Sequence, residues 1–297
     1  MEAGSALLDV ATLDRRLASA DPPVVVDVRW TPTVRRADDG GSLLAGSDHD
    51  AYLAGHLPGA VFCDLDADLA GPPGEGGRHP LPTAEALTAT LRRWGVSPGT
   101  RVVVHDTGSG PPLAAARAWW VLRWAGHADV RVLDGGLAAW TAAGHPLETG
   151  EVVPAPADDA VVHTGSMPIA ELDDLAAQVA SSGTVDGSFV DVRAAERFSG
   201  ATEPIDPVAG HVPGASNLPV DRLVGPDGRL LDGDALRAVL GDLVGAPAGA
   251  VTASCGSGVA ASVLVLALHE VGVDAALFPG SWSQWTRDPS RPVEVGS

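Results

Sequence analysis

The sequence predicts an α/β fold made of two tandem domains, each a mainly parallel sheet flanked by helices. Three observations predict it. The chain has 297 residues, which is long for one hydrophobic core, so two domains of about 150 residues are expected. Four blocks of sequence occur twice in the same order. Within each copy, short β-rich runs alternate with helical patterns, as they do in parallel α/β sheets.

The four repeated blocks align the two halves of the chain. They pair VVVDVRW (24–30) with FVDVRAAERF (189–198), GHLPGAVFCDLD (55–66) with GHVPGASNLPVD (210–221), RVVVHDTGSG (101–110) with GAVTASCGSG (249–258), and VLDGGLAAWTAAGHPLE (132–148) with LFPGSWSQWTRDPSRPVE (277–294). The first copy has longer loops, notably TPTVRRADDGGSLLAGSDHD (31–50). We therefore expect a duplicated domain, with copies at 5–148 and 166–297. A linker rich in Pro, Ala and acids joins them at 149–165.

In the first copy, runs of β-branched residues predict strands and patterns with a period of 3.6 residues predict helices. The strands are expected at 23–28, 59–63, 101–105 and 129–133, and the helices at 83–94 and 112–125. The last of these helices carries AWWVLRWAG (118–126), whose aromatic side chains need a buried face.

The second copy repeats this alternation. Its strands are expected at 188–192, 214–218, 249–254 and 274–278, and its helices at 168–180, 233–243, 258–271 and 281–286. In such folds ligands bind at the C-terminal ends of the strands. Cys255 falls at one of these ends.

Composition limits the classes of function and partner. Hydrophobic residues make up 45% of the chain and charged residues 19%, as in a packed globular protein. The formal charge is −19, from 38 acidic residues and 19 arginines with no lysine, and such a field repels nucleic acid and anionic membranes. An anionic substrate therefore needs a local cluster of arginines.

Cellular location and cofactors are also limited by the sequence. The longest apolar stretch is about half of a membrane span, and no secretory signal precedes it, so a cytoplasmic protein is expected. Two cysteines make no disulfide framework, and neither CxxC nor HExxH occurs, so we expect no metal and no cofactor.

Cys255 is the strongest candidate for a reactive group. Gly256, Ser257 and Gly258 follow it directly, and a helix is expected to begin there. Backbone N–H groups from Gly256 to Ala260, together with the positive end of the helix, can stabilise a thiolate or a persulfide. The other cysteine, Cys63, lies in an apolar run and is expected to be a buried hydrophobic residue.

Two other classes of function compete with nucleophilic chemistry at Cys255. A phosphatase loop of the cysteine type needs an arginine six residues after the cysteine, and this position is Ala261. A non-catalytic sulfur carrier or binding module is the other alternative, and the intact glycine-rich turn argues against it.

The order DVR, GHxPGA, CGSGVA and a final glycine followed by a tryptophan resembles that of the two-domain rhodanese superfamily, over nearly the whole chain. The loop CGSGVA is similar to that of the 3-mercaptopyruvate sulfurtransferases. Thiosulfate-preferring members carry Arg-Lys after the cysteine, where this chain has Gly256 and Ser257. The resemblance implies two tandem rhodanese-like domains, of which the second is catalytic and the first is not. Asp106 stands in the place of the cysteine in the first copy and is expected to cap the next helix.

The resemblance also implies roles for particular residues. Cys255 is the implied nucleophile, and Arg197 is the implied ligand of a donor carboxylate or sulfonate. The loop residues implied to bind the substrate are Gly256, Ser257, Gly258, Val259 and Ala260. The chain departs from the mercaptopyruvate subgroup at 203–206, where Glu-Pro-Ile-Asp replaces a setting with a second arginine.

Other residues have two open interpretations. His56 and His211 each precede a PGA sequence, which favours a shared structural role, with a catalytic role of His56 at the domain interface as the alternative. Trp30 matches an aromatic residue that family members place near the pocket between the domains, or it is simply a core residue. The Ser257 hydroxyl can bind a substrate carbonyl or relay a proton. Arg29 and Arg193 are expected to be structural.

The function expected from these observations is sulfur transfer. Cys255 would take a sulfane sulfur from 3-mercaptopyruvate, a small anionic donor, and pass it from a persulfide to a thiol or cyanide acceptor. A thioredoxin-like protein is one such thiol acceptor. Thiosulfate is the alternative donor.

Overall fold

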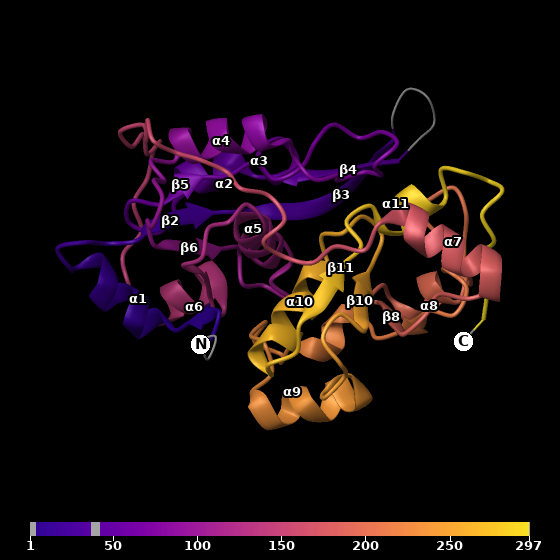
Figure 1. Ribbon diagram of the computed structural model, residues 1–297. Helices are drawn as coiled ribbons and strands as arrows, with labels where there is room; N and C mark the ends of the chain where they lie inside the picture. Colours follow the sequence, from indigo (N-terminus) through magenta and orange to yellow (C-terminus); the bar gives the residue numbers. More distant parts are fainter. Residues whose placement is uncertain (1–3, 37–41, 297) are drawn as a thin grey trace.

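The computed structural model describes residues 4–36 and 42–296. It contains two parallel sheets (Figure 1). The first has five strands in the order β1-β7-β6-β2-β5, and the second has four in the order β11-β10-β8-β9. All strand pairs in these two sheets run parallel, which confirms the expected fold class.

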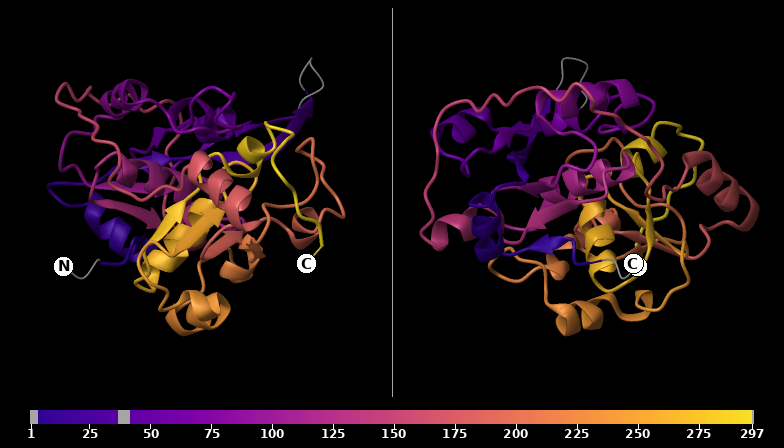
Figure 2. Two further views of the ribbon diagram at one scale, coloured as in Figure 1. Left: turned by 45° about the vertical axis from the view of Figure 1, so that its right-hand side comes forward. Right: turned by 60° about the vertical axis from the view of Figure 1, so that its left-hand side comes forward.

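The first sheet and its helices occupy the N-terminal half of the chain. The strands are β1 (Leu7–Leu8), β2 (Val24–Asp27), β5 (Val61–Phe62), β6 (Val102–His105) and β7 (Val130–Leu133). The helices are α1 (Val10–Leu17), α2 (His49–Ala54), α3 (Leu65–Asp68), α4 (Ala84–Arg93), α5 (Leu113–Trp124) and α6 (Gly136–Ala142). Views from two further directions show helices on both faces of the sheet (Figure 2).

The second sheet and its helices occupy the C-terminal half. The strands are β8 (Ser188–Asp191), β9 (Ser216–Asn217), β10 (Val251–Ser254) and β11 (Ala275–Leu277). The helices are α7 (Leu172–Ser182), α8 (Ala195–Phe198), α9 (Gly233–Leu240), α10 (Ala261–Glu270) and α11 (Ser281–Trp285), with 3₁₀ turns η1 (Val220–Leu223) and η2 (Gly241–Leu243).

Every strand and helix expected from the sequence overlaps an observed one. The segment 31–50 was wrongly expected to be a loop. Strands β3 (Trp30–Arg36) and β4 (Ser42–Ser47) pair antiparallel within it, and α2 begins at His49. Residues 37–41 of that segment lie outside the described part of the chain. The segment 149–165 contains no helix or strand.

The two halves share one hydrophobic core. Helix α5 packs against α10, and the two helices lie side by side between the sheets (Figure 1). Both helices are apolar nearly all round, which is typical of helices buried on every side. A single cluster of buried side chains extends from the first sheet through these helices into the second.

Strand register sets the position of the site. Asp191 at the end of β8 pairs with Ser254 at the end of β10. The residues that follow, Val192 and Cys255, therefore leave the sheet at the same edge. This is the carboxyl edge, where ligands of parallel sheets bind.

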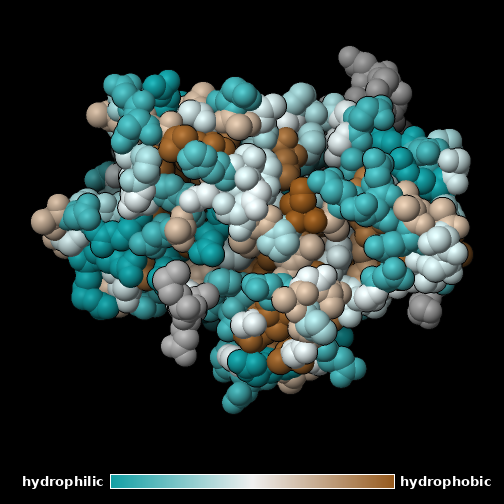
Figure 3. All heavy atoms as spheres, in the orientation of Figure 1, coloured by the Kyte–Doolittle hydropathy of each residue, from teal (hydrophilic) through white to brown (hydrophobic). Residues whose placement is uncertain are grey.

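The surface and the helix lengths bear on membrane insertion. On the face seen in Figure 3, hydrophobic residues form small patches among hydrophilic ones. Within residues 4–36 and 42–296, no helix is both long enough and apolar enough to cross a bilayer.

Candidate active site

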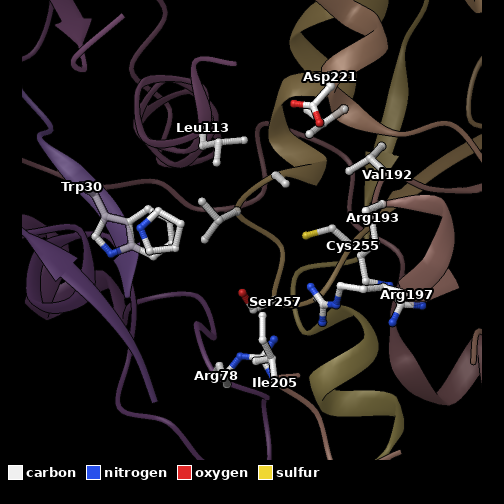
Figure 4. Close-up of a pocket in the computed structure, with 16 residues that line it drawn as sticks. Trp30, Arg78, Leu113, Val192, Arg193, Arg197, Ile205, Asp221, Cys255 and Ser257 are labelled. Carbon is white, nitrogen blue, oxygen red and sulfur yellow. The ribbon is translucent and has the colours of Figure 1, made fainter. Parts of the chain in front are cut away.

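A pocket of about 260 Å³ opens between the two domains at the carboxyl edge of the second sheet. Trp30 and Leu113 of the first domain face Val192 and Arg197 of the second across it (Figure 4). Cys255 lies in its wall and is 3% exposed. The small exposed part of the cysteine thus contributes to the lining of this pocket.

The turn after Cys255 is built around its sulfur. The N–H of Gly258 donates to Sγ at 3.1 Å, and the Ser281 hydroxyl lies 4.0 Å from Sγ. Gly258 has a φ of +80°, and a Cβ there would be 2.2 Å from the carbonyl oxygen of Pro279, so only glycine fits. Several N–H groups were expected around the sulfur. Among the described residues, the Gly258 amide is the one backbone group that donates to it.

Ser281 holds the cysteine from behind. The N–H of Cys255 donates to its Oγ at 3.1 Å, and the hydroxyl donates to the carbonyl of Phe278 at 2.8 Å. Ser281 is fully buried and has a φ of 50°. Within the described ranges it is the only residue other than glycine with positive φ. A strained backbone at this point indicates that its hydroxyl matters to the site.

Ser257 is joined to a histidine and a carboxylate of the first domain. Its Oγ lies 2.8 Å from Nδ1 of His79, and Nε2 of the same ring lies 3.1 Å from Asp66. Since the carboxylate accepts from Nε2–H, Nδ1 is left to accept the Ser257 proton. Trp30 packs edge-on against His79 and donates to Asp66 at 3.3 Å, which fixes both groups.

A cluster of arginines and carboxylates lies beside the cysteine. Arg197 donates to Glu203 at 2.8 Å and to Asp206 at 3.1 Å. Arg193 holds Asp191 at 2.7 Å and reaches Glu203 at 3.4 Å. Glu203 and Asp206 are almost fully buried, so their charges are neutralised by these arginines.

The first domain adds a third arginine, which the sequence analysis did not find. Arg78 forms an ion pair with Asp206, and its backbone N–H donates to Ser283 at 3.1 Å. Arg78 and His79 lie in GPPGEGGRHP (71–80), which has no helical or strand period. The chain has no lysine, so an arginine directly followed by a histidine is the one local signal that could have marked this segment as part of a site.

A fully buried arginine supports this loop. Nη2 of Arg117 in α5 donates to the carbonyl of His79 at 3.0 Å. In the described part of the chain Arg117 has no carboxylate partner, and its Nε and Nη1 lack hydrogen bonds. Burial lowers the pKa of Arg117 to about 10, and the charge of Cys255 acts in the opposite direction. Arg117 therefore places a positive charge behind the site and holds His79.

One family model matches both domains of the chain. The model of the Rhodanese-like domain matches residues 9–143 and 171–288, which is most of the chain and covers both domains. This chain belongs to the rhodanese-like family.

In the described residues no group of three or more His, Cys, Asp or Glu side chains could hold a metal ion.

Rhodanese relatives span the whole length of the chain. It is 45% identical over 295 residues to a Mycobacterium tuberculosis protein named "Putative thiosulfate sulfurtransferase SseB", covering 99% of this chain and 98% of that one. It is 44% identical over 250 residues to a Pseudomonas aeruginosa protein named "Probable 3-mercaptopyruvate sulfurtransferase", covering 82% and 86%. The structure of 3-mercaptopyruvate sulfurtransferase from Leishmania major superposes with a TM-score of 0.78 at 28% identity, covering 96% and 76%.

Most of the site residues that were predicted from the sequence of this chain lie together at the pocket. Its lining includes Trp30, Arg197, Cys255, Gly256, Ser257, Val259 and Ala260. Gly258 lies behind the sulfur and contacts it through its N–H. Helix α10 begins at Ala261, three residues later than expected, because the turn around Cys255 occupies the residues before it.

His56 does not reach the pocket. It is fully buried, its Nδ1 bonds the carbonyl of Tyr52 at 3.0 Å, and its ring stacks on Tyr52 at 4.2 Å. His211 bonds the carbonyl of Phe198 at 2.8 Å and stacks on that ring in the same way. This geometry favours the shared structural role and gives the catalytic alternative no contact with the site.

Cys63 and Asp106 lie apart from this chemistry. Cys63 is fully buried in the core, and burial raises the pKa of its thiol well above the ordinary value. The Asp106 carboxylate accepts the N–H groups of Gly108 at 3.1 Å and Ala115 at 3.4 Å. Ala115 is in the first turn of α5, so Asp106 satisfies a free donor of that helix.

Proposed function

We propose that this protein is a sulfurtransferase that moves a sulfane sulfur from 3-mercaptopyruvate to a thiol or cyanide acceptor through a persulfide on Cys255. One observation carries the proposal: a single pocket contains a cysteine whose sulfur accepts the N–H of Gly258, a cluster of arginines, and the Ser257–His79–Asp66 chain. The names of the M. tuberculosis and P. aeruginosa relatives support the same class of reaction.

In the first half-reaction, the Cys255 thiolate attacks the sulfur of 3-mercaptopyruvate. An S–S bond forms, the carbon–sulfur bond breaks, and its electron pair passes to carbon as the enolate of pyruvate. A proton completes pyruvate. Through Ser257, His79 accepts the proton of the Cys255 thiol as the reaction starts and returns it to the carbon of the enolate, while the persulfide keeps the proton of the donor thiol and Asp66 stabilises the charged imidazole.

In the second half-reaction, an acceptor thiolate or cyanide attacks the outer sulfur of the persulfide. The S–S bond breaks, the acceptor leaves as a persulfide or thiocyanate, and the Cys255 thiolate is regenerated. The pocket admits a small molecule or the end of a flexible chain, so a thioredoxin-like protein would have to present its thiol on an exposed tip. A cytoplasmic location remains a prediction from the sequence.

The charge of the pocket favours 3-mercaptopyruvate as donor. Arg78, Arg193 and Arg197 are matched by three carboxylates, Asp191, Glu203 and Asp206. A neutral network accommodates one added negative charge more easily than two, and thiosulfate is a dianion. Ser257 can also donate to the keto oxygen, which thiosulfate lacks.

Thiosulfate is the second candidate, and two observations favour it. The 45% identical relative is named for this donor. Arg78 adds to the pocket a cation that Gly256 and Ser257 do not supply.

Steady-state kinetics with both donors and one shared acceptor test the proposal. We expect kcat/KM for 3-mercaptopyruvate to exceed that for thiosulfate by at least about tenfold, or roughly 1.4 kcal/mol. A preference for thiosulfate under matched conditions would establish the second candidate. No sulfur transfer from either donor would contradict the proposed function itself.

A further inference from the structure

Asp221 brings a carboxylate to the end of the pocket that lies away from the arginines. It is exposed, and it lines the pocket together with Cys255. Figure 4 shows Asp221 at one end and the guanidinium groups of Arg78 and Arg197 at the other, with the sulfur of Cys255 between them. Since the pocket has a volume of about 260 Å³, a molecule of a few heavy atoms that reaches the sulfur can also reach Asp221.

The backbone holds Asp221 in place. It belongs to η1, which packs against α10 and whose Leu223 is fully buried. The N–H of Val220 donates to the carbonyl of Val192 at 3.0 Å, and Val192 leaves the sheet beside Cys255. The backbone of Asp221 is therefore fixed relative to the sulfur.

The charge of Asp221 is not neutralised by a neighbour. The other carboxylates beside the site, Asp191, Glu203 and Asp206, each form an ion pair with an arginine. Among the side chains that the structure describes, none forms an ion pair or a hydrogen bond with the Asp221 carboxylate. One end of the pocket thus has balanced charges, and the other end has a negative charge without a partner.

Apolar side chains surround Asp221 at its end of the pocket. Leu113 of the first domain and Val192 of the second lie there (Figure 4), and Val220 precedes Asp221 in the chain. An apolar wall screens a charge less than open solvent does, so the carboxylate acts more strongly on a bound molecule. It is also the group at this end that can pair with a polar part of that molecule.

We infer that Asp221 is a specificity-determining residue for the sulfur acceptor: its carboxylate favours small thiols that carry a cationic amine and disfavours thiols that carry a carboxylate. This inference rests on the proposed function and names the class of acceptor in its second half-reaction. A cationic aminothiol presents its sulfur to the persulfide and its ammonium group to Asp221, which stabilises the opposite charge.

The amine takes no part in the bond changes. The acceptor thiolate attacks the outer sulfur of the persulfide, and a new S–S bond forms. The S–S bond to Cys255 breaks, and its electron pair returns to Cys255 as the thiolate. The outer sulfur leaves on the acceptor with its proton, and the ammonium group keeps its own proton throughout.

The test measures the second half-reaction alone. The protein is loaded with sulfur from 3-mercaptopyruvate or thiosulfate, freed of donor and mixed with one thiol, and the loss of persulfide is followed by rapid quenching and intact mass. Cysteamine carries an ammonium group, 2-mercaptoethanol is uncharged, and 3-mercaptopropionate carries a carboxylate. Because these thiols differ in reactivity, each rate constant of a variant is divided by that of the unmodified protein with the same thiol.

Removal of the charge should act in opposite directions on the two charged thiols. In Asp221→Asn we expect the second-order rate constant to fall about threefold with cysteamine and to rise about threefold with 3-mercaptopropionate, the size of one partly screened charge interaction. With 2-mercaptoethanol we expect a change of less than about 1.5-fold. Asp221→Arg should move both ratios further in the same directions, and added salt should reduce them.

A matched control separates a local effect from the net charge of the protein. Asp234→Asn removes the same charge from an exposed position in α9 that does not line the pocket. Its rate constants should equal those of the unmodified protein with all three thiols.

The outcomes separate this inference from the proposed function. An equal change with all three thiols in Asp221→Asn would mean that the side chain only shapes the pocket, and would overturn the inference. Unchanged rate constants with all three would overturn it as well. If the unmodified protein formed no persulfide with either donor, the proposed function itself would fail.

Discussion

At the end of β6 in the first domain and of β10 in the second, the chain makes a glycine-containing turn around two different side chains. Asp106 accepts the N–H of Gly108 at 3.1 Å, and Cys255 accepts the N–H of Gly258 at 3.1 Å. Both glycines have positive φ and press against a backbone carbonyl. The turn therefore accommodates a carboxylate as well as a sulfur, so the turn alone does not define a sulfur site.

The surroundings of the two turns differ more than the turns themselves. Aligning Asp27 with Asp191 puts Thr33 in the first copy where Arg197 stands in the second. The cations and the histidine that surround Cys255 come partly from the other domain, through Arg78 and His79. The chemistry thus depends on where the two copies meet and not on either copy alone.

The largest expected effect comes from moving the nucleophile. Cys255→Ser should gain no sulfur from 3-mercaptopyruvate, whereas the unmodified chain and Cys63→Ser should each gain one sulfur, roughly 32 Da, by intact mass. Asp106→Cys in the Cys255→Ser background should also gain none, because its turn lacks the arginines that lie beside Cys255. Sulfur on that double variant would show that the turn alone is sufficient.

Ionisation of the buried Asp106 carboxylate should lower the free energy of unfolding. Burial raises the pKa of Asp106 from 3.8 to about 6, so its neutral form stabilises the folded state below pH 3.8. This stability is lost as the pH rises through about 6, and the shift corresponds to roughly 3 kcal/mol. Asp106→Asn should therefore gain about that much relative to the unmodified chain between pH 4 and pH 8.

Denaturant unfolding of both proteins across this pH range measures the difference directly, since the titration of all other groups cancels. A difference that does not change with pH would mean that Asp106 is already ionised at little cost.

We expect the first domain to contribute to catalysis through His79. Ser257→Ala and His79→Ala should each lower kcat with 3-mercaptopyruvate by about 100-fold, the range for a positioned proton-transfer group. Because the two residues act as one chain, the double variant should be no slower than either single variant. Multiplicative losses would show that His79 and Ser257 act independently.

The smallest effect concerns the residue behind the sulfur. Ser281 has a φ of 50°, and Gly136, its counterpart by the repeat, has a φ of 52°. Ser281→Ala leaves the Cys255 N–H unpaired and should destabilise the fold by about 1–3 kcal/mol. Ser281→Gly loses the same bond but relieves the backbone, so it should be more stable than Ser281→Ala by about 1 kcal/mol. Thermal unfolding of the two variants gives the comparison, and equal stabilities would contradict the presence of strain.

The sequence was enough to predict the residues that the second copy contributes to the candidate site. Cys255 and its glycine turn carry their own local signals, and the repeat fixes their place at a strand end. Arg197 came from the resemblance to the rhodanese superfamily, and it follows β8, a strand that pairs directly with β10.

The other half could not be read from sequence because it depends on packing between distant segments. His79 bonds Ser257, 178 residues away, and Arg78 bonds Asp206, 128 residues away. No local period marks GPPGEGGRHP, and the loop reaches the second domain because α5, whose Arg117 bonds the carbonyl of His79, packs against α10. The hairpin of β3 and β4 was missed for a local reason. The segment 31–50 is rich in polar residues and was therefore interpreted as a loop, although it contains two short strands that pair with each other.

The shared core has a consequence for the order of events in turnover. Separating the domains would expose the apolar faces of α5 and α10, at about 25 cal/mol for each Å² of apolar surface, so the shared core opposes opening of the pocket by a hinge. A volume of about 260 Å³ holds one small molecule at a time beside Cys255. In the proposed reaction, pyruvate must therefore leave by the same mouth before an acceptor enters. The protein then waits between the two substrates as a loaded persulfide, and its kinetics are ping-pong.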